Sequence, residues 1–227
     1  MKKLLLSTVL AALFATSSLA GMGGDILRTT LVVENLEYQF NDEKALTWDA
    51  YGFVGYDINK VYVYTEGEKI DGESLASESQ IVYSRAISSY WDMQVGVEYD
   101  KIETEKQTWL IAGVQGLAPY FFETRAVLLF GKDGTLGVKA HSEYEALITQ
   151  KLILTPSIAL SAYTQDIPEM GIGSGLSNIN VGVRLRYEFI REFAPYVGVE
   201  WSKNFGNTED LVELNETYAV GGLRFWF

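Results

Sequence analysis

The sequence predicts an all-β protein, a transmembrane antiparallel up-and-down β-barrel of about 12 strands in a bacterial outer membrane. Three observations carry this prediction: an export signal at the N-terminus, alternation of apolar and polar side chains along the remaining chain, and an aromatic C-terminal strand. After the export signal, no segment has the roughly 18 consecutive apolar residues that a membrane-spanning helix needs. If the chain crosses a membrane, it must therefore cross it with strands.

The start of the chain has the pattern of a secretory signal peptide. Lys2 and Lys3 form a charged start, residues 4–14 form an apolar stretch, and Ser18 and Ala20 supply the small side chains of a cleavage site. The apolar stretch is too short for a membrane anchor, which needs about 20 residues. We therefore expect three parts, namely a cleaved signal peptide at 1–20, a short periplasmic segment at 21–27 and the barrel at 28–227.

Alternation of side chains defines the strands. In Val181–Phe189 every odd position is apolar and every even position is Gly or charged, and in Asp92–Asp100 the odd positions again carry the apolar side chains. A period of two describes a strand with one lipid-facing side and one lumen-facing side. Twelve such segments run near Arg28–Asn41, Ala45–Ile58, Lys60–Ile70, Glu78–Ser89, Asp92–Ile102, Lys106–Leu117, Tyr120–Gly131, Thr135–Ile148, Leu152–Tyr163, Asn178–Ile190, Pro195–Lys203 and Thr217–Phe227.

The connections between these segments indicate how the barrel is oriented. Counted from the N-terminus, the even-numbered connections are all short. Among the odd-numbered ones, three are longer and polar or Gly-rich, at residues 67–79, 165–177 and 204–216. Bacterial barrels have short periplasmic turns and longer extracellular loops. We therefore expect short periplasmic turns, mostly longer extracellular loops, and both termini on the periplasmic side.

Aromatic residues support the membrane assignment. The chain ends in residues 223–227, a strand with alternating aromatics and a terminal Phe, and Trp48, Trp91 and Trp201 fall near strand ends, where interface girdles lie. We expect membrane lipids as partners, and the outer-membrane barrel assembly machinery as the partner of the C-terminal strand. A soluble β-sandwich or lipocalin-like barrel is the alternative, but a barrel of about twelve strands is too wide for apolar side chains to fill.

Charged side chains fall on the predicted lumen face of the strands. Both signs occur, so we expect internal ion pairs, which are weak evidence for stability by themselves. The lumen-lining polar candidates are Asp49, Arg125, Lys139, Glu143, Arg184, Arg186, Glu188, Glu200 and Arg224.

Composition excludes several classes of function. A net charge of −12 argues against a nucleic-acid partner, which needs a basic patch. The absence of Cys removes disulfides, thiolate metal sites and Cys nucleophiles. His141 is the only histidine and Ser142 follows it directly. Neighbouring strand residues face opposite sides, so these two cannot form a Ser–His pair, and we predict that the protein is not an enzyme.

Three stretches carry a family resemblance. Gly113–Glu123 reads GVQGLAPYFFE, Arg184–Trp201 reads RLRYEFIREFAPYVGVEW, and Gly221–Phe227 reads GGLRFWF. With these stretches the chain resembles the copper resistance protein B family of outer-membrane proteins, from Leu36 to Phe227. The resemblance implies a β-barrel in the outer membrane that takes part in copper tolerance, with periplasmic copper as the relevant ion.

Metal ligands are few. His141 is either one ligand of a weak divalent-metal site, with Glu143 beside it on the lumen face, or a member of an ion-pair network with Lys139. Met22 in the N-terminal segment and Met170 in an outer loop could each meet a soft metal only singly. Copper prefers thioether and imidazole ligands, and the chain has Met 4 and His 1. We therefore expect no tightly bound cofactor, with copper as the possible ion and His141, Glu143, Met22 and Met170 as weak candidates.

Three functions follow from this reading. The first is a part in copper resistance and copper homeostasis, by metal sequestration or by passage through the barrel. The alternative is a narrow general porin for small solutes without metal specificity. A third is a structural or adhesion barrel whose outer loops bind partners.

Overall fold

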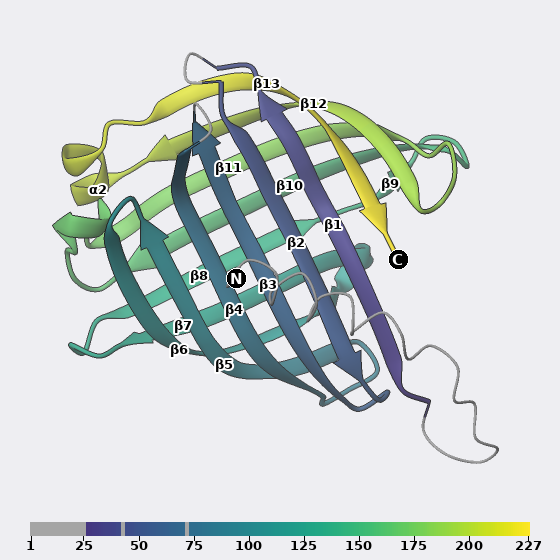
Figure 1. Ribbon diagram of the computed structural model, residues 1–227, viewed down its shortest axis with the longest axis horizontal. Helices are drawn as coiled ribbons and strands as arrows, with labels where there is room; N and C mark the ends of the chain where they lie inside the picture. The colour runs from purple at the N-terminus through teal and green to yellow at the C-terminus, as the bar shows by residue number, and fades with distance from the viewer. Residues whose placement is uncertain (1–25, 42–43, 71–72) are drawn as a thin grey trace, which may run out of the picture.

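The computed structural model describes residues 26–41, 44–70 and 73–227 and shows a closed β-barrel (Figure 1). The expected signal peptide and residues 21–25 of the expected periplasmic segment lie outside the described residues. The strands are β1 (Arg28–Gln39), β2 (Leu46–Gly55), β3 (Asn59–Ile70), β4 (Glu73–Ala86), β5 (Trp91–Ile102), β6 (Glu105–Ala118), β7 (Phe122–Gly131), β8 (Leu136–Glu143), β9 (Ala146–Leu147), β10 (Leu152–Tyr163), β11 (Gly175–Tyr187), β12 (Phe193–Asn204) and β13 (Asn215–Trp226).

The sheet closes on itself. Every strand pairs antiparallel with its neighbour, and the last strand, β13, pairs with β1 in the register Val32 to Trp226. Because β8 and β9 both pair with β10, they form one interrupted strand, and the barrel has twelve strands. A closed sheet satisfies every strand's backbone hydrogen bonds internally, which hydrocarbon requires. The predicted barrel is therefore confirmed.

The two faces of each strand differ as the alternation predicts. On β5 the outward side chains of Met93 and Tyr99 are 45% and 42% exposed. The inward side chains of Gln94 and Glu98 are 1% and 0% exposed. Apolar residues thus form the surface that meets lipid, and polar residues lie inside.

A β-bulge on β1 interrupts this alternation. The register with β2 shifts between Val33 and Asn35, which leaves Glu34 as the extra residue. Before the bulge an even-numbered residue, Val32, is buried inside the barrel. After the bulge an odd-numbered residue, Glu37, is buried there. An extra residue exchanges the two faces of a strand. The bulge therefore brings the consecutive residues Glu34 and Asn35 to the interior, where both line the same cavity.

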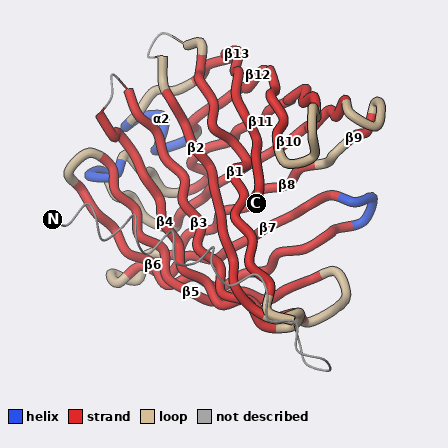
Figure 2. Tube along the Cα trace, turned by 45° about the vertical axis from the view of Figure 1, so that its right-hand side comes forward, coloured by secondary structure: helices blue, strands red, loops and turns tan. Residues whose placement is uncertain are grey.

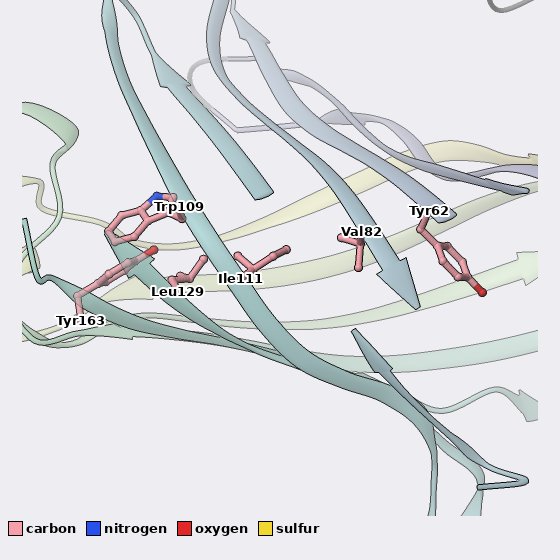
Figure 3. Packing of buried hydrophobic residues seen from close by; sticks show 6 residues of the cluster. All are labelled: Tyr62, Val82, Trp109, Ile111, Leu129 and Tyr163. Carbon is pink, nitrogen blue, oxygen red and sulfur yellow. The ribbon is translucent and has the colours of Figure 1, made fainter. Parts of the chain in front are cut away.

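The interior wall is not polar throughout. Six large side chains form an apolar cluster on the inner face of the barrel, among them Trp109 and Tyr163 with ring centroids 5.9 Å apart (Figure 3). Ile167 and Ile172, from the loop between β10 and β11, pack against this cluster. The cluster consists of Tyr62, Val82, Trp109, Ile111, Leu129 and Tyr163.

The connections define two ends of the barrel. One end, here called the turn end, carries the start of β1, the end of β13 and only short connections. The other, the loop end, carries the long β10–β11 and β12–β13 loops together with short connections such as β3–β4 and β5–β6. The helical segments η1 (Pro119–Phe121), η2 (Pro168–Met170) and α2 (Gly206–Leu211) lie at the ends of the barrel (Figure 2). Among the described residues, no helix is long and apolar enough to span a membrane. By the rule for bacterial barrels we take the turn end as periplasmic.

Two of the three expected long loops are present, and they contact each other. The loop at 164–174 contains η2, and the loop at 205–214 contains α2. Asp166 Oδ1 accepts a hydrogen bond from Asn207 Nδ2 at 3.1 Å, and the Gly173 backbone N–H donates to Thr208 Oγ1 at 2.9 Å. The two loops therefore form one joined cover at the loop end.

The prediction of a third long loop, at residues 67–79, is wrong. β3 continues to Ile70 and β4 begins at Glu73, and Glu66 pairs with Glu78 in the ladder between them. Where strands extend beyond the lipid, both faces can meet water and the alternation ends. A Gly-, Glu- and Ser-rich strand then has the composition of a loop.

Candidate functional site

Two cavities occupy the barrel interior, with volumes of about 610 Å³ and 430 Å³. The larger reaches toward the turn end, where Glu123 and Glu143 line it. The smaller reaches toward the loop end, where Met170 and Ile102 line it. The residues that line both cavities, here called the shared ring, are Asn35, Asp49, Glu66, Glu78, Lys139 and Ser161.

The shared ring is acidic. Asp49, Glu66 and Glu78 come from the consecutive strands β2, β3 and β4, and Lys139 on β8 is the ring's one cation. Neither Asp49 nor Glu66 forms a salt bridge with a described residue. A cation that moved between the two cavities would pass this ring.

Three carboxylates meet beside the ring and form what is here called the acidic cluster. Glu78 on β4 lies opposite Asp100 on β5 in the ladder, and Glu98 is two residues from Asp100 on the same inner face. One carboxylate oxygen from each lies within 4.8 Å of the others. Among the described residues this is the one group of three or more acidic or imidazole ligands so close together.

Neutral donors hold the acidic cluster in place. Gln80 Nε2 donates to Glu98 Oε2 at 2.8 Å and also to Glu78. Arg125 donates to Gln80 Oε1 at 2.5 Å, so the Gln80 amide nitrogen faces the carboxylates. Trp109 Nε1 donates to Asp100 Oδ2 at 2.9 Å. The other oxygen of Asp100, Oδ1, is buried without a hydrogen-bond partner among the described residues.

Lys139, on β8, supplies the positive charge of the acidic cluster from across the interior. Its Nζ lies 2.7 Å from Glu98 Oε1 and also contacts Glu78. The strands β5, β6 and β7 lie between β8 and β4, so this side chain crosses the interior. The cluster therefore sets three carboxylates against one ammonium.

The opposite part of the wall, here called the paired arc, is built from arginines and carboxylates on β1 and β11–β13. Arg184 donates to both oxygens of Glu37 at 3.0 Å and to Glu200 at 2.6 Å. Arg224 Nε donates to Glu34 at 2.6 Å. Two-pronged arginine–carboxylate pairs of this kind fix geometry as well as charge. Each carboxylate of the paired arc thus has an arginine partner.

The lumen candidates from the sequence divide between the cavities. Arg186, which bonds Glu145 at 2.6 Å, also lies 3.6 Å from Glu188, which lines neither cavity. Glu200 lines the smaller cavity only. Asp49, Arg125, Lys139, Glu143, Arg184, Arg186 and Arg224 line the larger cavity.

The structure does not bring the metal candidates together. His141 and Glu143 both line the larger cavity, but no third ligand completes a group with them among the described residues. Met170 is buried in η2 and lines the smaller cavity. Met22 lies outside the described residues. Lys139 makes its ion pairs with Glu78 and Glu98, and none with His141.

Sequence reasoning missed all three members of the acidic cluster. Glu98 and Asp100 occupy alternate positions of β5, which was a sufficient signal for the lumen face. Glu78 fell at the boundary between an expected loop and an expected strand. Glu34 and Glu37 were also missed, because the β1 bulge changes which face each one occupies.

Solved structures with the same architecture are outer-membrane porins. The NanC porin aligns with a TM-score of 0.55 at 10% identity, covering 87% of this chain and 99% of the porin. The KdgM porin in complex with disordered oligogalacturonate aligns with a TM-score of 0.51 at 10% identity, covering 87% and 99%. At such identity the likeness concerns the fold alone. Together with the apolar outer surface, it places this chain in the bacterial outer membrane.

Relatives at higher identity define the family. Copper resistance protein B of Escherichia coli is 34% identical over 203 residues, which cover 87% of this chain and 69% of the relative. The copper resistance protein B homolog of Pseudomonas syringae pv. tomato is 36% identical over 223 residues, covering 96% and 76%. The profile of the family described as copper resistance protein B precursor matches residues 27–227. The chain therefore belongs to the copper resistance protein B family.

Proposed function

We propose that this barrel serves copper resistance by binding Cu²⁺ weakly in its interior and letting it pass between the two cavities. The observation that carries the proposal is the shared ring, where Asp49, Glu66 and Glu78 face the single cation Lys139. Membership of the copper resistance protein B family supplies the metal. The chain's formal charge of −12 adds a general attraction for cations.

The chemistry of the ring favours passage over storage. Carboxylates bind hard and borderline divalent ions, and a given oxygen or nitrogen site generally binds Cu²⁺ more strongly than the other divalent first-row metals. The described ring holds no imidazole or thioether, the ligands that would retain copper firmly. A site of this kind attracts Cu²⁺ and releases it again, which conduction requires.

We also propose that the protein is not an enzyme. His141, the only histidine of the chain, lines the larger cavity, whereas Ser142 lines neither cavity and its hydroxyl bonds Thr124 at 2.9 Å. A nucleophile and its base need to lie within hydrogen-bond reach of each other.

A narrow general porin is the competing function. The larger cavity is lined by arginines as well as carboxylates, and its volume of about 610 Å³ is in the range of small-molecule sites. A general pore of this kind would pass small solutes of either charge. The two functions differ in how they depend on the carboxylates of the shared ring.

The test neutralises the ring without touching the paired arc. A strain that lacks the gene would carry either the wild type or the double variant Asp49→Asn, Glu66→Gln, with Glu209→Gln in the outer loop as the control. We expect copper tolerance and cation selectivity in planar bilayers to be lost in the double variant and kept in the control. Unchanged copper tolerance together with unchanged selectivity in the double variant would support the general porin and remove our proposal.

A further inference from the structure

We propose that the Lys139 ammonium is a tethered cation that occupies the acidic cluster, and that a divalent ion binds there only by displacing it. This inference rests on the proposed function, because it concerns the same interior path. It assigns a regulatory role to a side chain that would otherwise count as one more internal ion pair.

Lys139 is placed to close the path between the cavities. It is the one cation of the shared ring, and its side chain reaches from β8 to carboxylates on β4 and β5, which lie in the same closed sheet (Figure 1). Its Nζ lies 2.7 Å from Glu98 Oε1 and also contacts Glu78. An ion that left one cavity for the other would meet this ammonium first.

The acidic cluster has the features of a built cation site. Glu98 is fully buried and Asp100 is 8% exposed, and Gln80 and Trp109 hold one oxygen of each. Lys139 takes the remaining oxygen of Glu98, but Asp100 Oδ1 is buried with no hydrogen-bond partner among the described residues. A buried carboxylate oxygen without a partner is costly. A bound divalent ion would satisfy this oxygen, which the ammonium leaves unsatisfied.

The charge of the acidic cluster also fits a divalent ion better than an ammonium. One oxygen from each of three carboxylates lies within 4.8 Å of the others, and Lys139 supplies a single positive charge. Repulsion between the carboxylates is therefore only partly compensated while Lys139 occupies the cluster. Carboxylate oxygens are typical ligands of hard divalent ions.

Lysine, unlike arginine, is suited to leave such a site. Its ammonium is a compact, strongly hydrated charge on a flexible four-carbon chain, whereas a guanidinium makes fixed two-pronged pairs. Asp49 and Glu66 line the same ring and form no salt bridge with a described residue, so they can accept the displaced ammonium. The Lys139 ammonium thus has two positions. Beside Glu78 and Glu98 it blocks the acidic cluster, and beside Asp49 and Glu66 it leaves the cluster free for a divalent ion.

The experiment compares divalent affinity at constant charge. The mature chain would be purified in detergent as the wild type, as Lys139→Met, and as the double variant Glu78→Gln, Lys139→Met. The double variant keeps the formal charge of the wild type, so a gain in its affinity reports removal of the tethered cation. Lys60→Met is the matched control, because Lys60 also pairs with a carboxylate, Asp92 at 3.4 Å, but outside the shared ring. Equilibrium dialysis against CuCl₂ and MnCl₂ would give the affinities.

We expect Lys139→Met to bind both ions at least roughly tenfold more tightly, the double variant to gain roughly three- to tenfold, and Lys60→Met to match the wild type. If Lys139→Met fails to fold because its carboxylates repel, the charge-matched double variant decides alone. Affinity in the double variant equal to or below that of the wild type would overturn the proposal.

Failure of this inference and failure of the proposed function give different results. The dialysis experiment measures a difference between variants and does not involve copper tolerance. Unchanged copper tolerance and unchanged cation selectivity in the ring variant Asp49→Asn, Glu66→Gln remove the proposed function even if Lys139→Met binds tightly. Conversely, the ring variant could lose copper tolerance while neither Lys139 variant gains divalent affinity. That result would keep the proposed function and remove the tethered cation.

Discussion

Two parts of the barrel interior use the same residue types in opposite ways. On the paired arc, Glu37 and Glu200 share the guanidinium of Arg184, which reaches Glu37 with two bonds of 3.0 Å. The acidic arc, which we define as Asp49, Glu66 and the acidic cluster, holds five carboxylates, and Lys139 forms ion pairs with only two of them, Glu78 and Glu98. The paired arc has two guanidinium groups for its three carboxylates, and each carboxylate contacts one of them, whereas the acidic arc has one ammonium for five carboxylates.

The difference indicates which part of the wall maintains the structure and which part binds cations. Arginine forks hold their partners in one geometry and join strands distant in sequence, such as β11 and β1. A lysine on a flexible stem, with more carboxylates nearby than it can serve, has no single best partner. We therefore expect substitutions on the paired arc to change stability and substitutions on the acidic arc to change cation binding.

The largest expected effect is the loss of stability in Arg184→Met. This change leaves Glu37, which is 3% exposed, and Glu200 without their shared cation. Removal of one partner from a buried ion pair costs about 3–5 kcal/mol. Urea unfolding in lipid vesicles, followed by Trp fluorescence, would measure the loss.

The control for Arg184→Met is Arg28→Met, which removes an ion pair with Asp57 whose side chains are 61% and 64% exposed. An exposed pair contributes about 0–1 kcal/mol. Equal losses in the two variants would contradict the view that the paired arc holds the barrel together.

A crossed pair of substitutions tests the comparison directly. Glu98→Gln keeps the shape of the side chain and weakens the bond from Lys139, but it also relieves repulsion among three clustered carboxylates, so we expect stability to change by less than about 1 kcal/mol. We expect its Cu²⁺ affinity to fall about threefold, because one charge of the acidic cluster is lost. Dialysis and urea unfolding of the same preparations would give both numbers.

Glu200→Gln is the matched variant on the paired arc. It removes a charged acceptor of Arg184, which costs about 1–3 kcal/mol, and it leaves the acidic cluster intact. We expect its Cu²⁺ affinity to equal that of the wild type. If Glu200→Gln weakens binding as much as Glu98→Gln, the two arcs do not differ in role.

The cover at the loop end lies over the acidic arc, so loosening it tests whether the loops limit access. A Cβ at Gly173 would come within 2.2 Å of the backbone of Asn207 and Thr208. Gly173→Ala must therefore separate the two loops, at a cost of about 1–3 kcal/mol typical of overpacking. We expect faster hydrogen exchange in residues 164–174 and 205–214, and faster Cu²⁺ binding. Gly221→Ala, whose Cβ would meet Phe40 at an ordinary 3.4 Å, should show neither change.

The sequence predicted which residues face the barrel interior better than it predicted their interaction partners. Alternation assigned the lumen face of Lys139 and Arg184 without error of register, because lipid on one side imposes a strict period of two. The partners of these side chains could not be predicted. Lys139 and Glu78 are 61 residues apart, and they meet only because the closed sheet brings β8 opposite β4.

Local irregularities explain the remaining errors. The bulge at Glu34 exchanges the faces of β1, and no residue type there announces it. The strand extension that carries Glu66 and Glu78 lies where the alternation weakens, and it therefore read partly as a loop. Both places supply carboxylates to the interior, Glu34 to the paired arc and Glu78 to the acidic arc, so the sequence left carboxylates of both arcs unpredicted.

The smallest expected effect concerns the pH dependence of the loop cover. The backbone N–H of Ser174 and then the amide of Asn207 donate to the Asp166 carboxylate, and these bonds lower its pKa below the ordinary 3.8. A lowered pKa in the folded state means that the carboxylate stabilises the cover above pH 3.8 and loses this contribution as the pH falls through the lowered value. We expect single-channel recordings of the wild type to show more frequent loop openings at about pH 3 than at pH 7, as protonation begins. Asp166→Asn should open often at both pH values, because its side chain carries no charge to lose, and Asp133→Asn in the β7–β8 turn should behave as the wild type. A wild type whose openings do not depend on pH would show that the joined loops are held by the Thr208 contacts alone, and that access to the acidic arc is independent of this carboxylate.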